Sequence, residues 1–360
     1  MSMIGDKNAA EVFVVDNNSS DNSLKYLKPR FPEVNFLENS ENLGFSRANN
    51  QAIGVANGEY ILFLNPDTIL PEDCLITCLR FMDETPGAGA LGIRMIDGMG
   101  RYLPESKRGF PSPWISFCKM FGLTSAFPSS RLFAGYYMGH LDEKTNNEVD
   151  ILSGAYMMVR KNVLDKTGGF DERFFMYAED IDLSYRIQKA GFRNYFFAGS
   201  SIIHFKGEST RKDNFYVKQF YKAMVQFVRK HYSGGLSVMY ARFLELGIWL
   251  RASVSFLVSG NQKSKVKSQK PEASSVFFEG DNNSIAEAKA IIALYKEKKL
   301  ADSVSDADEI IFCQGDTMPL KTIISLMQKE QKTKKIHLKG TASIVGSASS
   351  KSKGEVLTSL

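Results

Sequence analysis

The sequence predicts an α/β protein in which a mostly parallel sheet covered by helices is followed by a small second α/β unit. Short apolar runs alternate with helical stretches between residues 12 and 96, and this alternation is typical of helix-covered parallel sheets. The clearest run, residues 60–64, is long enough for a buried strand but too short for a helix. A second alternation of strand-like and helical segments begins near residue 275.

Composition places the chain among soluble globular proteins. Its 360 residues, 43% hydrophobic and 24% charged, suit one large domain or two smaller ones. A net charge of +5 is only mildly basic, and the spread of the lysines disfavours nucleic-acid binding. The four cysteines show neither zinc spacing nor a disulfide framework, which fits a reducing cytoplasm. The first ten residues lack an apolar signal core, so we expect no secretion signal.

The first part of the chain alternates regularly. Four strands are predicted, at residues 12–15, 34–37, 60–64 and 90–96. Three helices are predicted between them, at residues 23–28, 48–56 and 71–84. Gly44 suits a tight turn and Ser46 is a good N-cap for the second helix.

Residues 101–148 interrupt this pattern, because they are rich in proline, glycine, aromatic and basic residues. We expect a long excursion that either covers the site or is a variable insertion. The regular pattern then resumes. Strands are expected at 149–160, 195–197 and 201–204, and helices at 161–165, 178–187 and 213–232.

The sequence divides into five parts. A catalytic-type domain over 1–235 precedes an amphipathic helix at 236–258, a linker at 259–275, a small α/β unit at 276–346 and a flexible tail at 347–360. The apolar segment 236–258 is not predicted to span a membrane, because each of its three charges would cost roughly 2.5–3.5 kcal/mol at mid-bilayer. We expect it to lie on a membrane or to pack on the domain.

Four acidic or imidazole features are predicted to meet at one sheet edge, since each follows a strand or opens a helix: Asp16, Asp67, Glu179–Asp180 and His204. Ligands bind along the carboxyl edge of open α/β sheets. Asp67 follows a strand ended by Asn65–Pro66 and is placed to hold a metal ion that carries a phosphate. Asp67 and His204 together suit manganese or a similar divalent ion.

Plainer interpretations of the same residues stay open. Residues 65–67 all favour ordinary turns, and His204 can be a satisfied strand-end residue. Asp16 either accepts hydrogen bonds from a base or ribose or caps a helix. Asp180 gains from the helix dipole, and the same dipole keeps it ionised, as a general base requires.

Five segments resemble bacterial family 2 glycosyltransferases, in particular rhamnosyltransferase-like members: residues 14–21, 42–45, 64–67, 154–155 and 179–186. The resemblance covers roughly residues 11–230. It implies a GT-A fold with a mostly parallel sheet, and transfer of a sugar from a nucleotide diphosphate with inversion at the anomeric carbon. The C-terminal unit resembles a Rossmann-like half-domain, but it has no Gly-x-Gly-x-x-Gly loop and is assigned no ligand.

The resemblance also implies roles for individual residues. Asn65–Pro66–Asp67 fills the place of the family's Asp-x-Asp signature, with Asp67 and His204 on a magnesium or manganese ion. Asp180 would be the catalytic base. Contacts with the nucleotide-sugar are implied for seven residues: Asp16, Asn18, Asn42, Gly44, Asn65, Gly154 and Ala155. Relatives have an additional strand and helix before the segment at Val12, and we expect this chain to lack them.

These features predict a hexosyltransferase that moves rhamnose or a similar hexose from a nucleotide-diphosphate donor. The expected acceptor is a lipid-linked or growing surface glycan, with Asp180 as general base and a divalent metal. We expect the protein in the cytoplasm, in peripheral contact with the inner face of the cytoplasmic membrane. The alternative is a shortened, non-catalytic relative that serves as a binding or scaffold partner in glycan assembly.

Overall fold

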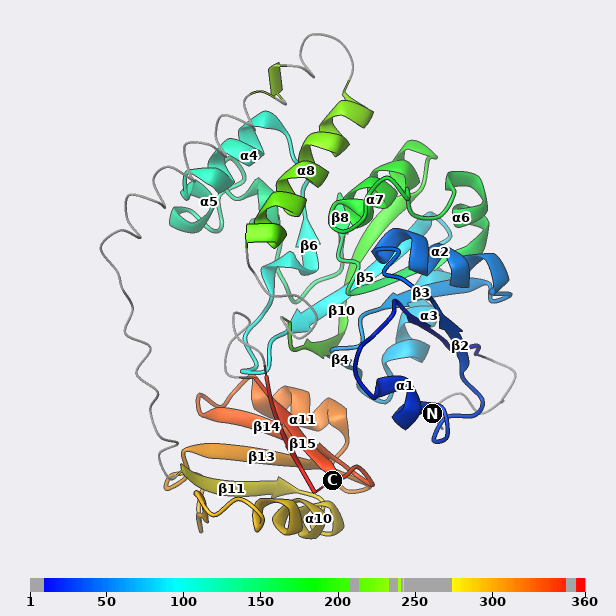
Figure 1. The fold of residues 1–360 in the computed structure, drawn as a ribbon. Helices are drawn as coiled ribbons and strands as arrows, with labels where there is room; N and C mark the ends of the chain where they lie inside the picture. The colour runs from blue at the N-terminus through cyan, green and yellow to red at the C-terminus, as the bar shows by residue number, and fades with distance from the viewer. Residues whose placement is uncertain are drawn as a thin grey trace.

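The structure is a computed structural model that describes residues 10–206, 214–232, 239–240, 242, 274–347 and 354–359. A large unit, coloured blue to green in Figure 1, lies against a smaller unit coloured yellow to red. The predicted helix at 236–258 and linker at 259–275 lie almost wholly outside the described residues. Among the described helices, none is long and apolar enough to cross a bilayer.

The core of the large unit is a six-stranded sheet. Its strand order is β3 (Tyr60–Leu64), β9 (Tyr156–Arg160), β5 (Ala88–Ile96), β10 (Arg193–His204) and β4 (Thr68–Ile69), and β7 (Asn147–Val149) also pairs with β10. The predicted α/β class is confirmed. Its pairing is more mixed than predicted, because β9 runs antiparallel between β3 and β5 and only β5 and β10 pair in parallel.

Helices cover both faces of this sheet. On one face α3 (Cys74–Glu84) buries Cys74, Cys78 and Met82 against the strands. On the other face lie α6 (Lys161–Thr167) and α7 (Glu179–Lys189). Every residue of β5 is buried, which is expected of a strand between two helical layers because its side chains alternate between the two faces. The segments 195–197 and 201–204 form one strand, β10, with an irregular register between Phe197 and Ser201.

The first two strands form a separate small sheet. β1 (Phe13–Asp16) pairs in parallel with β2 (Asn35–Glu38), with α1 (Ser23–Leu27) between them in the chain. α2 (Phe45–Val55) follows, and its N-cap is Gly44. Ser46 was expected as the cap but lies inside the helix, where its hydroxyl donates to Phe174 O at 2.6 Å.

The excursion between β5 and β7 contains more regular structure than expected. It holds two short 3-10 turns (Pro104–Ser106 and Gly135–Tyr137), strand β6 (Lys107–Arg108) and helices α4 (Pro113–Met120) and α5 (Leu123–Ala126). Ser112 caps α4 by accepting from Ile115 N at 3.2 Å. β6 pairs with β8 (Ile151–Leu152), so the base of the excursion is fixed to the large unit. α8 (Asn214–His231) occupies the predicted helix at 213–232.

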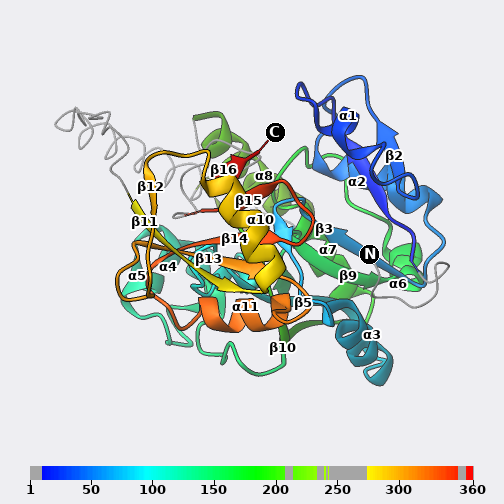
Figure 2. The same cartoon turned by 90° about the horizontal axis from the view of Figure 1, so that it is seen from below.

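The small unit is a second six-stranded sheet. Its order is β12 (Lys298–Leu300), β11 (Ser274–Gly280), β13 (Glu309–Gln314), β14 (Thr333–Leu338), β15 (Ser343–Gly346) and β16 (Glu355–Thr358). Helix α11 (Leu320–Met327) lies on the side of the large unit. Helix α10 (Asn282–Ile292) lies on the far side, nearest the viewer in Figure 2. The prediction of a flexible tail is wrong at 355–358, because Leu357 is buried with the α10 cluster.

Candidate active site

Asp67 and His204 lie side by side at the edge of the central sheet. Strands β4 and β10 are antiparallel, with His204 opposite Thr68, and Phe205 N donates to Asp67 O at 3.0 Å. His204 Nε2 is 3.3 Å from Asp67 Oδ1, and the two side chains are 9% and 10% exposed. Among the described residues, Asp67 Oδ1 is buried without a hydrogen-bond partner, which is costly for a polar atom. His204 Nδ1 also has no partner there, but Nε2 is the ring nitrogen that faces Asp67. A carboxylate and an imidazole suit a divalent cation, and Asp67 Oδ1 and His204 Nε2 would be the two atoms that hold it.

These two residues supply few ligands by themselves. Within the part of the chain that the structure describes, no group of three His, Cys, Asp or Glu residues is arranged to hold a metal. A cation held by Asp67 and His204 would therefore take its other ligands from a bound molecule. This is how magnesium is commonly held beside substrate phosphates.

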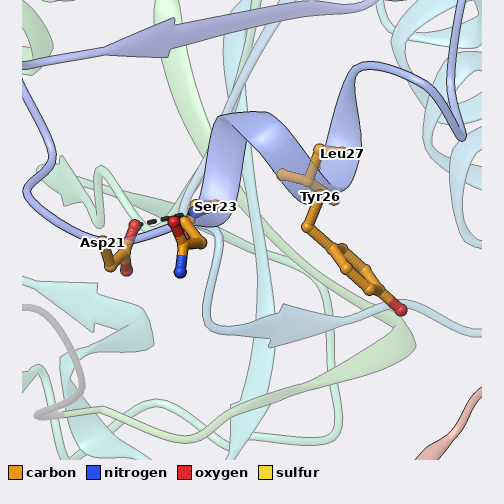
Figure 3. Close-up of a pocket in the computed structure, with 5 residues that line it drawn as sticks. Asp21, Ser23, Tyr26 and Leu27 are labelled. Atoms are coloured by element: carbon orange, nitrogen blue, oxygen red, sulfur yellow. Dashed lines mark hydrogen bonds between the residues drawn. The ribbon is translucent and has the colours of Figure 1, made fainter. Parts of the chain in front are cut away.

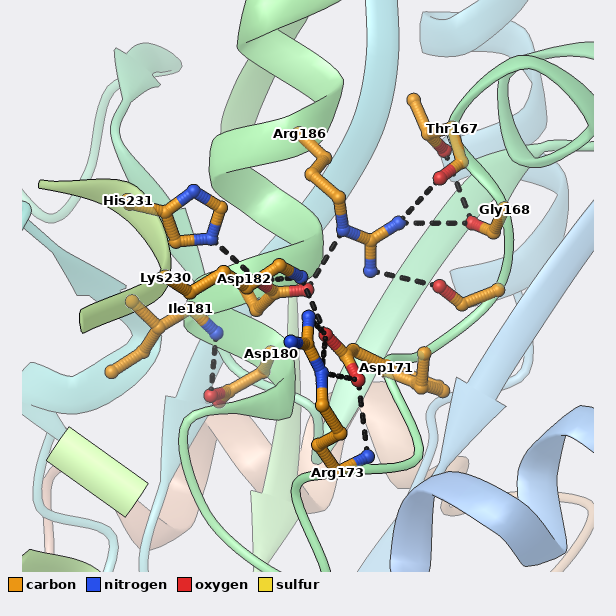
Figure 4. Close-up of polar contacts among 12 residues, drawn as sticks. Thr167, Gly168, Asp171, Arg173, Asp180, Ile181, Asp182, Arg186, Lys230 and His231 are labelled. Carbon is orange, nitrogen blue, oxygen red and sulfur yellow. Dashed lines mark hydrogen bonds and ion pairs between the residues drawn. The ribbon is translucent and has the colours of Figure 1, made fainter. Parts of the chain in front are cut away.

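Asp180 opens helix α7, and each of its carboxylate oxygens is oriented by a donor. Oδ1 accepts from Ile181 N at 2.8 Å, a contact drawn in Figure 4. Oδ2 accepts from Gly154 N at 3.2 Å and from the guanidinium of Arg108. Just before the helix, Tyr177 and Ala178 have φ angles of 70° and 64°. Left-handed backbone at two consecutive non-glycine residues is strained, and such strain gathers at functional sites.

Arg108 is a site residue that the sequence did not single out. It lies in β6, donates to Leu152 O at 3.0 Å and pairs with Asp180. Burial by itself would lower the pKa of Arg108, but Asp180, Tyr136 and Glu105 together raise that pKa above its usual range. The one signal in the sequence was its position in a stretch, residues 106–141, that contains no Asp or Glu.

Glu179, beside Asp180, is a buried acid with an unpartnered oxygen. Its side chain is almost fully buried, and its Oε2 has no hydrogen-bond partner within the described part of the chain. Burial, and then the neighbouring charge of Asp180, raises the pKa of Glu179 to about 8. The carboxyl of Glu179 is therefore protonated near neutral pH.

Two further predicted residues lie at the junction of β3 and β9. Asn65 N donates to Ala155 O at 3.0 Å, and Asn65 O accepts from Thr68 Oγ1 at 2.7 Å. Gly154 is adjacent to Ala155 and donates to Asp180. The structure thus links Asn65 to Asp180 by two hydrogen bonds through the adjacent residues Gly154 and Ala155.

Asn42 and Gly44 form a tight turn against the loop that precedes α7. Gly44 N donates to Asn42 Oδ1 at 3.0 Å. Gly44 has a φ of 82°, and a Cβ there would lie 2.5 Å from Phe175 O. Only glycine fits such a position. The turn also accepts from Asn17 Nδ2 at 3.1 Å, which ties it to the loop after β1.

Asp16 and Asn18 are not on the edge predicted for them. Asp16 ends β1 in the separate two-stranded sheet, because β1 pairs with β2 and not with the six-stranded sheet that contains β3. Its Oδ2 accepts from Ser19 N at 3.1 Å, a local turn contact. Asn18 is exposed with a φ of 63°. The expected meeting of Asp16 with Asp67 at one sheet edge is therefore wrong for Asp16.

A surface pocket of about 340 Å³ lies beside α1 (Figure 3). Its lining is Asp21, Asn22, Ser23, Tyr26 and Leu27. None of the predicted site residues is among them.

Asp182 is a structural residue, although it is close to Asp180 in sequence. It is fully buried and accepts from Arg186 Nε at 2.8 Å, Lys230 Nζ at 2.5 Å and His231 Nε2 at 2.6 Å. Figure 4 shows these three side chains around Asp182. The predicted i,i+4 pair with Arg186 is confirmed. Through Lys230 and His231, Asp182 also connects α7 to α8.

Comparison with known proteins shows the family. A family model described as glycosyl transferase family 2 matches residues 4–168. An N-acetylglucosaminyl-diphospho-decaprenol L-rhamnosyltransferase of Mycobacterium tuberculosis is 30% identical over 213 residues, which are 56% of this chain and 68% of that protein. The chain belongs to glycosyltransferase family 2. The rhamnosyltransferase WbbL of Escherichia coli is 28% identical to this glycosyltransferase over 218 residues, which are 58% of this chain and 76% of WbbL.

Solved structures similar to this glycosyltransferase are more distant. S. aureus TarS residues 1–349 give a TM-score of 0.41 at 19% identity, over 73% of this chain and 67% of that one. A mannosyltransferase from Pyrobaculum calidifontis, solved with GDP-Man and Mn²⁺, gives 0.42 at 16% identity, over 79% and 72%.

Proposed function

We propose that this glycosyltransferase is an inverting enzyme that moves rhamnose or a similar hexose from a nucleotide-diphosphate donor to a glycan or lipid-linked acceptor. The observation that carries the proposal is the environment of Asp180. A carboxylate offers about four lone-pair sites. Oδ2 already accepts from Arg108 and Gly154, whereas Oδ1 accepts, among the described residues, from Ile181 N alone. Oδ1 therefore keeps a site for the proton of an acceptor hydroxyl.

The reaction assigned to this site is a single displacement. The acceptor oxygen forms a bond to the anomeric carbon as the bond from that carbon to the diphosphate breaks. The electron pair of the broken bond leaves with the nucleoside diphosphate, and the hydroxyl proton goes to Asp180 Oδ1. Because the acceptor attacks opposite the leaving group, the configuration inverts. A positioned base typically contributes about 10²–10⁴-fold to such a step.

Asp67 and His204 would hold a divalent cation, magnesium or manganese. The buried Oδ1 of Asp67, which faces His204 Nε2 at 3.3 Å and has no hydrogen-bond partner among the described residues, supports this assignment. When bound, such a cation would supply positive charge against the diphosphate of the donor. The hydrogen bond between Asn65 and Ala155 fixes the loop after β3, and this holds Asp67 next to β10.

We further propose that the acceptor is lipid-linked and that the protein works at the inner face of the cytoplasmic membrane. The M. tuberculosis relative is named for a diphospho-decaprenol acceptor. In this chain, α4, α5 and the following loop expose large apolar side chains: Trp114, Phe121, Phe127 and Leu132. The absence of Asp and Glu from residues 106–141 makes this region compatible with anionic lipid.

A binding or scaffold role in glycan assembly is the second candidate. Arg108 favours it, because its guanidinium already occupies Asp180 Oδ2. An enzyme must keep Oδ1 accessible while Oδ2 is held, whereas a scaffold has no such requirement. Measured donor binding and turnover distinguish the two candidates.

The test is a calorimetric screen of nucleotide-sugars with and without Mn²⁺. We expect one donor to bind the wild-type protein only when Mn²⁺ is present, and Asp67→Asn and His204→Gln to lose this binding. Asp165→Asn is the matched control, because Asp165 is an exposed carboxylate on α6 that pairs with Lys161. Binding of the donor without any metal, or equal binding by Asp67→Asn, would contradict the proposed metal site.

A further inference from the structure

The small C-terminal unit packs directly behind Asp67 and His204. One apolar cluster joins the two units: Ile96, Ile203 and Phe205 of the large unit are buried together with Ile310, Phe312, Leu320, Ile323, Ile324, Met327 and Ile336 of the small unit. Ile69 of β4 is packed against the same cluster. Phe205 immediately follows His204, and Ile69 is two residues beyond Asp67. The backbone segments that carry Asp67 and His204 therefore continue directly into the interface between the two units.

The segment after Asp67 also caps a helix of the small unit. Glu72 accepts from Leu320 N at 2.7 Å and from Lys321 N at 3.2 Å. Helix α11 begins after Pro319 and has no side-chain cap of its own. Helix starts need acceptors for their free N–H groups and favour negative charge. Glu72 thus supplies the missing cap from the other unit, and Asp73 adds an ion pair with Lys321 at 2.5 Å.

The turn after β5 fits closely against the same helix. Lys334 Nζ donates to Met99 O at 2.9 Å, and Arg94 Nη1 donates to Gln328 Oε1 at 2.8 Å. Gly100 has a φ of 77°, and a Cβ there would lie 2.0 Å from Met327 O. Such a close approach of two backbones requires glycine. The interface therefore combines close backbone packing with hydrogen bonds from two buried basic side chains, Arg94 and Lys334.

We propose that the C-terminal unit is a structural support for the metal site, with Glu72 and Phe205 as positioning residues for Asp67 and His204. The proposal rests on the metal role assigned above to that pair. A metal site needs its ligands held closely in place by surrounding packing and hydrogen bonds. Here the segments 67–73 and 203–205 are held from behind by α11 and its neighbours. Loosening α11 would therefore loosen both ligands together.

The test compares two buried isoleucines of the small unit. Ile324 belongs to the inter-unit cluster, whereas Ile291 belongs to the cluster on the far side of the sheet, and they are 4% and 3% exposed. Mn²⁺ is titrated into full-length protein, alone and with UDP, GDP or dTDP. Bound and free ion are counted from the electron paramagnetic resonance signal. We expect Ile324→Ala to raise the Kd for Mn²⁺ about 3- to 10-fold, and Ile291→Ala to leave it unchanged.

A second variant keeps the test decisive if Ile324→Ala fails to fold. Glu72→Gln keeps the shape of the side chain but removes its charge, and we expect it to raise the Kd for Mn²⁺ in the same direction. Asp67→Asn is the reference and should abolish the binding. Lost binding in Asp67→Asn beside unchanged Kd values in Ile324→Ala and Glu72→Gln would overturn the supporting role alone. Full binding by Asp67→Asn would overturn the metal assignment and this inference with it.

Discussion

Arg108 and Asp180 form a buried ion pair that joins the excursion after β5 to the start of α7. The two side chains are 13% and 14% exposed. The pair leaves one carboxylate oxygen, Oδ1, with room for a further donor, so Arg108 orients the proposed base without blocking it. In this account Arg108 acts through Asp180 and is a positioning residue.

Arg108→Ala should lower kcat by about 10²-fold, because a misplaced catalytic group costs roughly that much. The donor Kd should stay within about twofold, since Arg108 contacts Asp180 and Leu152 O and not the Asp67–His204 pair. Steady-state kinetics and calorimetry measure the two quantities. Arg108→Lys, or guanidinium added to Arg108→Ala, should restore part of kcat. Arg193→Ala is the control, because Arg193 is an exposed arginine paired with Glu148. An equal loss in kcat and in donor binding would argue against positioning.

Glu179 should make the protein less stable as the pH rises. The pKa of Glu179 in the folded protein is about 8, against an ordinary value of 4.5. Between these values the folded state binds more protons than the unfolded state, so the free energy of unfolding falls as pH rises. Inside that window the slope approaches about 1.4 kcal/mol per pH unit. Urea unfolding from pH 5 to pH 8 should show this decline in the wild type and a smaller decline in Glu179→Gln. Equal slopes would contradict the buried, protonated state of Glu179.

The exposed aromatic side chains of α4 and its C-cap, Trp114 and Phe121, should bind lipid. Trp114→Ala combined with Phe121→Ala should weaken sedimentation with anionic phosphatidylglycerol vesicles at least tenfold, since burying one such side chain is worth roughly 1.5–3 kcal/mol. Ile76→Ala is the control, because Ile76 is a similarly exposed apolar residue on α3. Equal vesicle binding by the double variant and the wild type would contradict the proposed contact with the membrane.

Local patterns predicted much of the fold. The strand at 60–64 was predicted at its observed bounds, and the helix at 213–232 differs by one residue at each end. The predicted strand at 149–160 is divided into β7, β8 and β9, because the bends near Asp150 and Ser153–Gly154 turn the chain before β9 runs back between β3 and β5. Strand pairing depends on residues distant in sequence, so an apolar run reveals a strand but not its partner.

The candidate site shows the same limit. Asp67, His204 and Asp180 could be predicted as candidates because each stands at the end or start of a regular element. Arg108 could not, because it reaches Asp180 across 72 residues of chain, and its place in a stretch without Asp or Glu does not reveal that partner. β15 and β16 were also missed, since they are short strands that become recognisable only when Ile344 and Leu357 meet α10.

The most direct test of the central claim is the rate of sugar transfer by Asp180→Asn, measured in single turnovers with the donor found by calorimetry. We predict a loss of about 10²–10⁴-fold, as expected for removal of a general base, with the donor Kd unchanged because Asp67 and His204 are intact. Transfer at the wild-type rate by Asp180→Asn would contradict the assignment of Asp180 as the base.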